Sequence, residues 1–373
     1  MRKRKPVFVM KSIKVGSAKS VPGQLTFGYI KTMDLPIGLS DRIPVMIAQG
    51  TEPGPTFFIT ANVHGNELTG IAVIHDLVTE GLAQELKGTI VAIPSLNPSG
   101  LRAYDRSPDF DTKDPNKLYP AGKFSKKEDE DEDSKFPTRY ELVAKRVFAP
   151  IKKYANFHID IHNHSLRSIP YSILDRIFYT NEVDRKKAET LARKQKAMVE
   201  AFGVFYAVDF PPKKYLRVKY HRSVSGAVLN TLRVPAFTVE LGSNNVLYPN
   251  IVSGAVKGIR NVLRWAKLLP GGYEKITEFP TMPPDQRYRR IEHPRTKHSG
   301  LIRFTVNPGD RVEVGQPIAR ITDLWGRRVG DGYIYTEHPG IMIALYSEMT
   351  KYENDVIAEM AIPDDEDIFA PYP

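Results

Sequence analysis

Short apolar runs alternate along the chain with longer segments that have helical spacing. Thr56–Val63 is apolar and nearly free of charge, which is typical of a buried strand. Apolar residues then recur three or four positions apart, which predicts a helix over Glu67–Leu82. Strands that alternate with helices indicate an α/β sheet with helices on both faces. The remaining predicted strands are Gln24–Met33, Ile43–Ala48, Thr89–Ile93, Asn156–His162, Val204–Val208 and Ala236–Leu241, and the remaining predicted helices are Thr138–Pro150, Asp184–Phe202, Ser223–Leu232 and Asn250–Leu268.

The pattern changes beyond Glu292. Short apolar stretches are separated there by Gly, Pro and Asp turns, as in Asn307-Pro308-Gly309-Asp310, and this predicts a small all-β region. A chain of 373 residues is long for a single core. We therefore expect two domains, 1–285 and 286–373.

The segment between Ser95 and Pro137 has no convincing apolar period. Long irregular segments are usually functional or disordered. Its later part is a dense run of Lys, Glu and Asp, which predicts a charged surface insertion over 123–137.

Composition narrows the classes of function. Hydrophobic content of 41% and charged content of 26% are ordinary for a globular protein, and the absence of cysteine excludes disulfides, thiolate metal sites and cysteine nucleophiles. The apolar run Val7–Met10 is too short for a signal-peptide core, and no run approaches the ~18 apolar residues of a membrane span. These features predict a cytoplasmic protein without a membrane partner.

The formal net charge of +10 raises the question of an anionic partner. The basic clusters lie at Arg2–Lys5, Lys213–Arg222 and Arg287–Arg290, and no nucleic-acid-binding motif accompanies them. A solvated basic surface is therefore expected in preference to nucleic-acid binding, although the clusters could attract carboxylate substrates.

His64 and Glu67 are three residues apart at the predicted strand-to-helix turn, and Gly65 between them permits a tight turn. Imidazole and carboxylate are zinc ligands, and open α/β sheets bind ligands where their strands end. An isolated pair of this kind also occurs by chance on exposed helices.

A second group lies on the predicted strand Asn156–His162. Alternation places His158, Asp160, His162 and His164 on one face. His162, at the strand end, is the best third ligand, and Asp160 could orient a ligand from behind. The alternative is an edge strand with one solvated face.

Glu240 lies within the apolar strand Ala236–Leu241. A carboxylate there could act as a general base beside a metal, or it could be a strand-end residue paired with a surface Lys or Arg. In the irregular segment, Arg102, Arg106, Asn116 and Lys117 offer positive charge and amide dipoles that could stabilise an oxyanion and hold a carboxylate.

Taken together, these motifs resemble the succinylglutamate desuccinylase/aspartoacylase family of the zinc carboxypeptidase clan. The resemblance runs from about Pro44 into the C-terminal region. The matching motifs are His64-Gly65-Asn66-Glu67, Asn97-Pro98-Ser99-Gly100 followed by Arg106, Asp114-Pro115-Asn116-Lys117-Leu118-Tyr119-Pro120, Asp160-Ile161-His162 and Thr238-Val239-Glu240-Leu241-Gly242.

The resemblance implies a zinc-carboxypeptidase-like fold and one Zn²⁺ per chain, held by His64, Glu67 and His162. It also implies that Glu240 is the general base and that Arg106 stabilises the oxyanion. Lys117 departs from the family, because relatives carry an arginine there, and lysine keeps the charge without the bidentate fork.

The C-terminal stretch resembles a barrel-sandwich module that many relatives append. It lacks the modified lysine motif of biotinyl or lipoyl carriers, so a role in capping the site or in forming a homo-oligomer is expected instead.

The resulting prediction is a zinc-dependent hydrolase that deacylates an N-acyl amino acid or a similar amine, with Arg102, Asn116 and Lys117 near the anionic end of the substrate. Two alternatives remain at this point: a zinc carboxypeptidase that acts on short peptides, and a non-catalytic metal-binding or scaffold protein.

Overall fold

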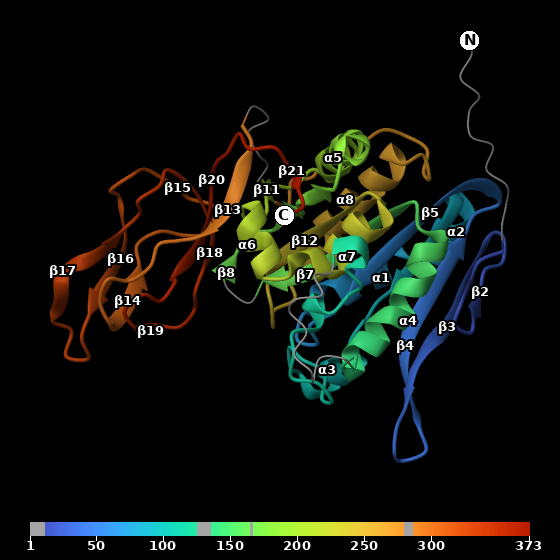
Figure 1. Cartoon of the computed structure of the whole chain (residues 1–373), viewed down its shortest axis with the longest axis horizontal. Coiled ribbons are helices and arrows are strands. Elements are labelled where there is room, and N and C mark those ends of the chain that lie inside the picture. Colours follow the sequence, from blue (N-terminus) through green and yellow to red (C-terminus); the bar gives the residue numbers. More distant parts are fainter. Residues whose placement is uncertain (1–11, 125–135, 165–166, 280–285) are drawn as a thin grey trace, which may run out of the picture.

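The computed structural model describes residues 12–124, 136–164, 167–279 and 286–373. Within these residues a 13-stranded mixed sheet forms the centre of the molecule, in the order β15-β18-β20-β13-β11-β9-β12-β7-β5-β6-β4-β3, with β8 paired to β18 (Figure 1). The predicted α/β class is confirmed. The strands of this sheet are β3 (Gln24–Asp34), β4 (Ser40–Gln49), β5 (Glu52–Ala61), β6 (Lys87–Ile93), β7 (Phe157–His164), β8 (Arg167–Ser168), β9 (Tyr171–Leu174), β11 (Tyr206–Val208), β12 (Ala236–Ser243), β13 (Tyr288–Glu292), β15 (Arg311–Val312), β18 (Gly340–Leu345) and β20 (Ala358–Pro363).

Helices cover both faces of this sheet. On one face, Ile161 of β7 packs against α1, and Phe237 of β12 contacts Phe202 of α5 edge to face. On the other face, Ser225 of α7 hydrogen-bonds Thr238 of β12. The helices are α1 (Thr69–Leu77), α2 (Glu80–Glu85), α3 (Pro98–Ala103), α4 (Arg139–Tyr154), α5 (Glu182–Phe202), α6 (Pro212–Arg217), α7 (Val224–Leu232) and α8 (Pro249–Trp265), and the 3-10 turns include η1 (Pro115–Lys117), η2 (Gly122–Phe124) and η5 (Tyr220–Arg222).

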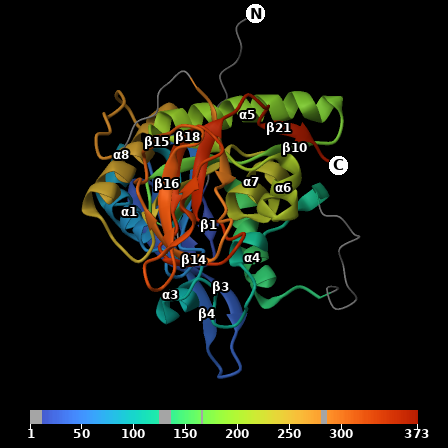
Figure 2. The same cartoon turned by 90° about the vertical axis from the view of Figure 1, so that its left-hand side faces the viewer.

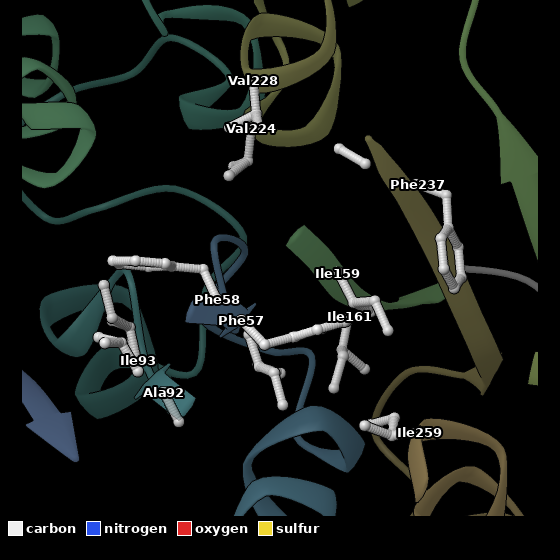
Figure 3. Packing of buried hydrophobic residues seen from close by; sticks show 14 of the residues in the cluster. Phe57, Phe58, Ala92, Ile93, Ile159, Ile161, Val224, Val228, Phe237 and Ile259 are labelled. Carbon is white, nitrogen blue, oxygen red and sulfur yellow. The ribbon is translucent and has the colours of Figure 1, made fainter. Parts of the chain in front are cut away.

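The largest hydrophobic cluster lies between these layers, because strand alternation sends apolar side chains to both faces of the sheet. Figure 3 shows Phe57, Ile161 and Ile259 together on one side and Val224 and Val228 of α7 on the other. All five side chains are fully or almost fully buried. This core fixes β5, β7 and β12 side by side, in parallel pairs.

The central position of β7 excludes the edge-strand alternative for its polar face. Its neighbours are β5 and β12, and His158, Asp160 and His162 are all buried. The predicted helix over Glu67–Leu82 is wrong in one respect. It is two helices, because the chain leaves the helical conformation at Val78 and the Thr79 side chain caps α2 by accepting from Leu82 N at 3.2 Å.

The predicted C-terminal β-structure is also present. A separate four-stranded sheet has the order β17-β16-β14-β19 and projects from the main body (Figure 1), and in Figure 2 it is turned toward the viewer, in front of that body. Its strands are β14 (Gly300–Phe304), β16 (Pro317–Thr322), β17 (Arg328–Tyr335) and β19 (Thr350–Lys351). Two further two-stranded pairs are formed by β1 (Lys14–Val15) with β2 (Ala18–Lys19) and by β10 (Ile177–Tyr179) with β21 (Phe369–Pro371).

The C-terminal region does not lie apart from the main sheet. β13 pairs in parallel with β11 at Val208↔Arg289, and β20 and β18 extend the same sheet. The division into 1–285 and 286–373 stays a prediction. Most of the predicted insertion over 123–137 lies outside the described residues, as does the basic cluster Arg2–Lys5. No helix among the described residues combines the length and the apolar character that crossing a membrane requires.

Candidate active site

Three predicted ligands meet at one end of the central strands. His64 and Glu67 follow β5, His162 lies near the end of β7, and β5 and β7 are parallel neighbours. One ligand atom from each residue lies within 4.8 Å of the others, and all three side chains are buried. The donor set of two imidazoles and one carboxylate suits a zinc ion.

The two imidazoles face Glu67 through the same ring atom. Nδ1 of His64 lies 2.6 Å from Glu67 Oε1, and Nδ1 of His162 lies 2.9 Å from Glu67 Oε2. Burial opposes ionisation of Glu67, but the charges of His64 and His162 hold its pKa well below the usual range. Burial also opposes the His162 cation, while Asp160 and Glu67 raise its pKa well above the usual value. The cluster therefore favours positive charge at its centre, which fits a divalent cation.

Each imidazole is held from behind by a carboxylate. Asp160 Oδ2 lies 2.8 Å from His162 Nε2, and Asp114 Oδ1 lies 3.1 Å from His64 Nε2. Thr60 donates to Asp160 Oδ1 at 2.5 Å and so fixes that carboxylate in turn. A carboxylate on the outer nitrogen sets the tautomer of a metal-binding histidine and raises its basicity. Asp114 was not assigned this role from the sequence, because its distance from His64 depends on the fold of the irregular segment.

Glu240 of β12 lies beside His162 of β7 in the strand register. It is partly buried, and Oε2 is a buried atom without a hydrogen-bond partner among the described residues. Burial raises the pKa of Glu240, against the opposing charges of His162 and His164. Within the described residues no Lys or Arg forms an ion pair with Glu240, so the surface-pair alternative gains no support from the structure.

The four residues of the irregular segment occupy different positions. Arg106 lies 3.5 Å from Glu67 and 3.2 Å from Asp114 and lines the cavity. Asn116 also lines the cavity, and its Oδ1 accepts from Val224 N at 2.9 Å. Lys117 Nζ is 3.5 Å from Asp114 but is not part of the lining. Arg102 is mostly exposed, lies 3.7 Å from Asp109 and does not line the cavity.

The cavity has a volume of about 320 Å³ and continues from the His64–Glu67–His162 cluster over the sheet face that carries Thr238 and Glu240, past Ser223 at the start of α7. Its far side carries residues that were not predicted as site residues. Among them are Asp175 after β9, Asp209 after β11, Arg290 on β13 and Glu359 on β20. Asp209 directly follows the predicted strand Val204–Val208, and a polar residue at a strand end was the signal that identified His64 and His162. Arg290 belongs to the basic cluster Arg287–Arg290, which the sequence indicated only as a possible attraction for carboxylate substrates, and Glu359 carried no signal in the sequence.

Comparison with known proteins supports the resemblance that these motifs indicated. The family model of the succinylglutamate desuccinylase/aspartoacylase catalytic domain matches residues 53–266. An N-alpha-acetyl-L-2,4-diaminobutyric acid deacetylase of Halomonas elongata is 25% identical over 324 residues, which cover 86% of this chain and 85% of that protein.

Solved structures agree on the fold. A succinylglutamate desuccinylase from a Silicibacter species superposes with a TM-score of 0.70 at 19% identity, over 95% of this chain and 100% of that one. The product-bound ectoine utilization protein EutE (DoeB) of Ruegeria pomeroyi superposes with a TM-score of 0.67 at 21% identity, over 91% and 94%. Because the family model spans more than half of the chain and includes the strands that carry the site, the chain belongs to the succinylglutamate desuccinylase/aspartoacylase family.

Proposed function

We propose that this chain is a zinc-dependent hydrolase that removes the acyl group from an N-acyl amino acid or a similar amine. The observation that carries the proposal is the convergence of His64, Glu67 and His162 next to Glu240, whose Oε2 has no partner among the described residues. Family membership and the deacetylase name of the Halomonas relative support the reaction class. The proposal includes one zinc ion per chain and a cytoplasmic location, with no nucleic-acid partner.

His64, Glu67 and His162 would hold the metal, with Asp114 and Asp160 fixing the two imidazoles. Bound zinc supplies Lewis acidity, which makes water a stronger acid and an amide carbonyl a better electrophile. The same ligand set could hold another divalent ion, so the identity of the metal belongs to the proposal.

Glu240 acts as the general base in this account. Its carboxylate accepts the proton of the attacking water and then delivers a proton to the leaving amine. Burial raises its pKa, which brings the group closer to neutral pH and improves it as a proton donor in the second step. The raised pKa also means that the deprotonated form is lost at a higher pH than for an ordinary glutamate.

Arg106 is the group best placed to stabilise the negative charge that develops on the carbonyl oxygen, because its guanidinium is beside Glu67 and lines the cavity. Asn116 would contact the substrate from the same side. Lys117 adds positive charge behind Asp114 without reaching the lining, so its proposed role is electrostatic. Arg102 has no part in the proposal.

A carboxypeptidase would use the same catalytic centre. The cavity favours the deacylase, since about 320 Å³ lies at the low end of the ~300–1,000 Å³ of small-molecule sites. A small N-acyl amino acid fits that volume better than an extended peptide.

The test is a release assay on the zinc-loaded protein with acetyl, succinyl and longer N-acyl amino acids on one side and short unblocked peptides on the other. The expected result is hydrolysis of at least one N-acyl amino acid class, with loss of activity after chelation and recovery with zinc. Preference for peptides would establish the carboxypeptidase instead. A native protein without bound metal and without activity on either panel would support the scaffold alternative.

A further inference from the structure

Two polar side chains lie behind the metal ligands, and the proposed mechanism does not use them. His158 is on β7, and alternation places it on the same face as Asp160 and His162. Thr60 is on the neighbouring strand β5, where it pairs with Asp160 in the register. His158 and Thr60 are fully buried and do not line the cavity, so neither side chain can touch a substrate.

A series of hydrogen bonds joins these two residues to the metal site. Nε2 of His158 lies 2.9 Å from Thr60 Oγ1, and Thr60 Oγ1 donates to Asp160 Oδ1 at 2.5 Å. The other oxygen of Asp160, Oδ2, lies 2.8 Å from Nε2 of His162. Among the described residues, no side chain other than Thr60 and His162 hydrogen-bonds Asp160. Each oxygen of this buried carboxylate thus has a single side-chain donor.

The direction of each hydrogen bond follows from the carboxylate. A carboxylate only accepts hydrogen bonds, and a threonine hydroxyl has a single proton to donate. Since Thr60 donates that proton to Asp160, its oxygen can only accept from His158, and the ring must carry its proton on Nε2. Burial lowers the pKa of His158 to about 4, against the charge of Asp160. The ring is therefore neutral at neutral pH, and its Nδ1 carries no proton.

The series ends inside the protein at His158. Nδ1 of His158 is buried and has no hydrogen-bond partner within the described part of the chain. Since this end reaches no donor or acceptor, the series does not carry protons to water. A buried polar atom without a partner also lowers stability, and an apolar side chain at this position would avoid that cost. The hydrogen bond from His158 to Thr60 is thus the feature of the ring that packing alone does not explain.

We propose that His158 and Thr60 are positioning residues for the metal centre. His158 holds the Thr60 hydroxyl toward Asp160, and this engages Oδ1 and leaves Oδ2 for His162. The carboxylate then cannot rotate without losing a donor, so Nε2 of His162 keeps its proton and Nδ1 offers its lone pair to the metal. The inference rests on the proposed zinc-dependent function and adds two residues that act on the metal only through Asp160.

Two matched pairs of variants test these hydrogen bonds by zinc affinity, which does not depend on turnover. Thr60→Val keeps the shape of the side chain and removes the hydroxyl, whereas Thr60→Ser keeps the hydroxyl. His158→Leu removes the donor, whereas in His158→Gln the amide nitrogen lies as many bonds from Cβ as Nε2 does and can donate to Thr60. Competition against a chromophoric chelator should give an affinity about tenfold lower in Thr60→Val and in His158→Leu, and an affinity close to that of wild type in the two conservative variants.

Equal zinc affinity in wild type and in all four variants would overturn the proposal. Equal losses in Thr60→Val and Thr60→Ser, or in His158→Leu and His158→Gln, would also overturn it, because packing rather than hydrogen bonding would then control the site. Urea unfolding of the metal-free proteins shows which variants fold, and one folded pair is enough to decide.

A double variant tests whether the effect passes through Asp160. In an Asp160→Asn background, Thr60→Val should lower zinc affinity little further, because the group that Thr60 orients has already lost its charge. Two losses that multiply would show that Thr60 acts on the metal site by another route, and would contradict the proposal.

NMR of isotope-labelled histidine reads the tautomer of His158 directly. Its ring signal, identified by its absence in His158→Gln, should show a proton on Nε2 and none on Nδ1 at neutral pH. Thr60→Ser should keep this tautomer, and Thr60→Val should lose its fixed preference for it. A ring protonated on Nδ1, or on both nitrogens, would overturn the assigned direction of the series.

These measurements separate the inference from the proposed function. If the protein hydrolyses N-acyl amino acids and all variants bind zinc equally well, the deacylase stands and the positioning role falls. If the zinc affinities and the tautomer are as expected but neither N-acyl amino acids nor peptides are hydrolysed, the positioning role stands and the deacylase falls.

Discussion

At the scale of single residues, the site is organised by carboxylates as much as by metal ligands. His162 and His64 each present Nδ1 to Glu67, because Asp160 and Asp114 engage their Nε2 atoms at 2.8 Å and 3.1 Å. Without those carboxylates either ring could adopt the other tautomer or rotate. The geometry therefore predicts that an outer carboxylate controls metal affinity without touching the metal.

Asp160→Asn tests this prediction. The amide oxygen of the variant is neutral, so it accepts the hydrogen bond from His162 without the negative charge that makes the imidazole more basic. Zinc affinity should therefore fall by about 10- to 100-fold with the fold intact. Competition titration against a chromophoric chelator measures the change. Asp105→Asn is the control, because Asp105 is exposed in the loop after α3 and its carboxylate accepts from the backbone N–H of Ser107. Unchanged zinc affinity in Asp160→Asn would show that the Asp160–His162 contact has no role in metal binding.

At the scale of elements, the site depends on the close approach of the His64–Glu67 turn to helix α3. A Cβ built on Gly65 would lie 2.0 Å from the carbonyl carbon of Gly100 in α3. From the sequence, Gly65 was expected to permit a tight turn. Its φ is not positive, so the backbone conformation does not require glycine. Glycine is required because the backbone of α3 packs directly against the His64–Glu67 turn. Gly65 N also donates to Arg106 O at 3.3 Å, which joins this turn to the segment that carries Arg106.

Gly65→Ala should therefore destabilise the protein by about 1–3 kcal/mol or more and weaken zinc binding, because the clash is with backbone that cannot move without shifting α3. Urea unfolding and the same chelator titration measure both effects. Gly81→Ala is the matched control. A Cβ at Gly81 would have Thr79 Oγ1 as its nearest neighbour at 3.8 Å, and alanine in helix α2 should raise stability by about 0.5–1 kcal/mol. Equal stability of the two variants would contradict the packing argument.

The elements also show what sequence patterns can and cannot predict. α4 was predicted from its pattern of apolar residues as Thr138–Pro150, and in the structure it begins with a capping box between Thr138 and Glu141. β8, β9 and β10 were missed, since two to four residues are too few to show a period. The neighbours of β9 in the sheet could not be predicted from its own residues. For this reason Glu240 was identified as a candidate from local pattern and family motif, whereas Asp175 was not.

At the scale of the whole molecule, the main sheet carries the C-terminal region into the site. Arg290 of β13 and Glu359 of β20 line the cavity opposite His164 of β7, so residues more than a hundred positions apart form one buried charged group. Although burial opposes ionisation, Arg290 and His164 lower the pKa of Glu359 to about 2. The sequence pattern predicted strands here without indicating that they extend the catalytic sheet.

Buried Asp175 gives the whole molecule a pH-dependent stability. Its folded-state pKa of about 7, raised by burial and by Asp209, lies above the ~3.9 of an unfolded chain. Between these two pKa values the folded state holds a proton on Asp175 that the unfolded state has released. The contribution of this proton to the free energy of unfolding is fully present below pH ~4 and is lost as the pH rises to about 7.

Asp175→Asn removes this dependence. The free energy of unfolding of the variant, relative to that of wild type, should be about 2 to 3 kcal/mol higher at pH 8 than at pH 5. Urea unfolding at both pH values measures this difference. The exposed Asp105→Asn control should follow wild type. A variant that gains nothing at pH 8 would show that the carboxyl is not held in a protonated form at neutral pH.

The central claim is that Glu240 and the His64–Glu67–His162 cluster act together in metal-assisted amide hydrolysis. The most direct measurement is the zinc content and the turnover of Glu240→Gln on the best N-acyl amino acid substrate. The account predicts one zinc ion per chain, as in wild type, and a kcat reduced by about 10²- to 10⁴-fold, because the amide side chain cannot accept the proton of water. A Glu240→Gln variant that binds zinc and turns over at the wild-type rate would contradict the account.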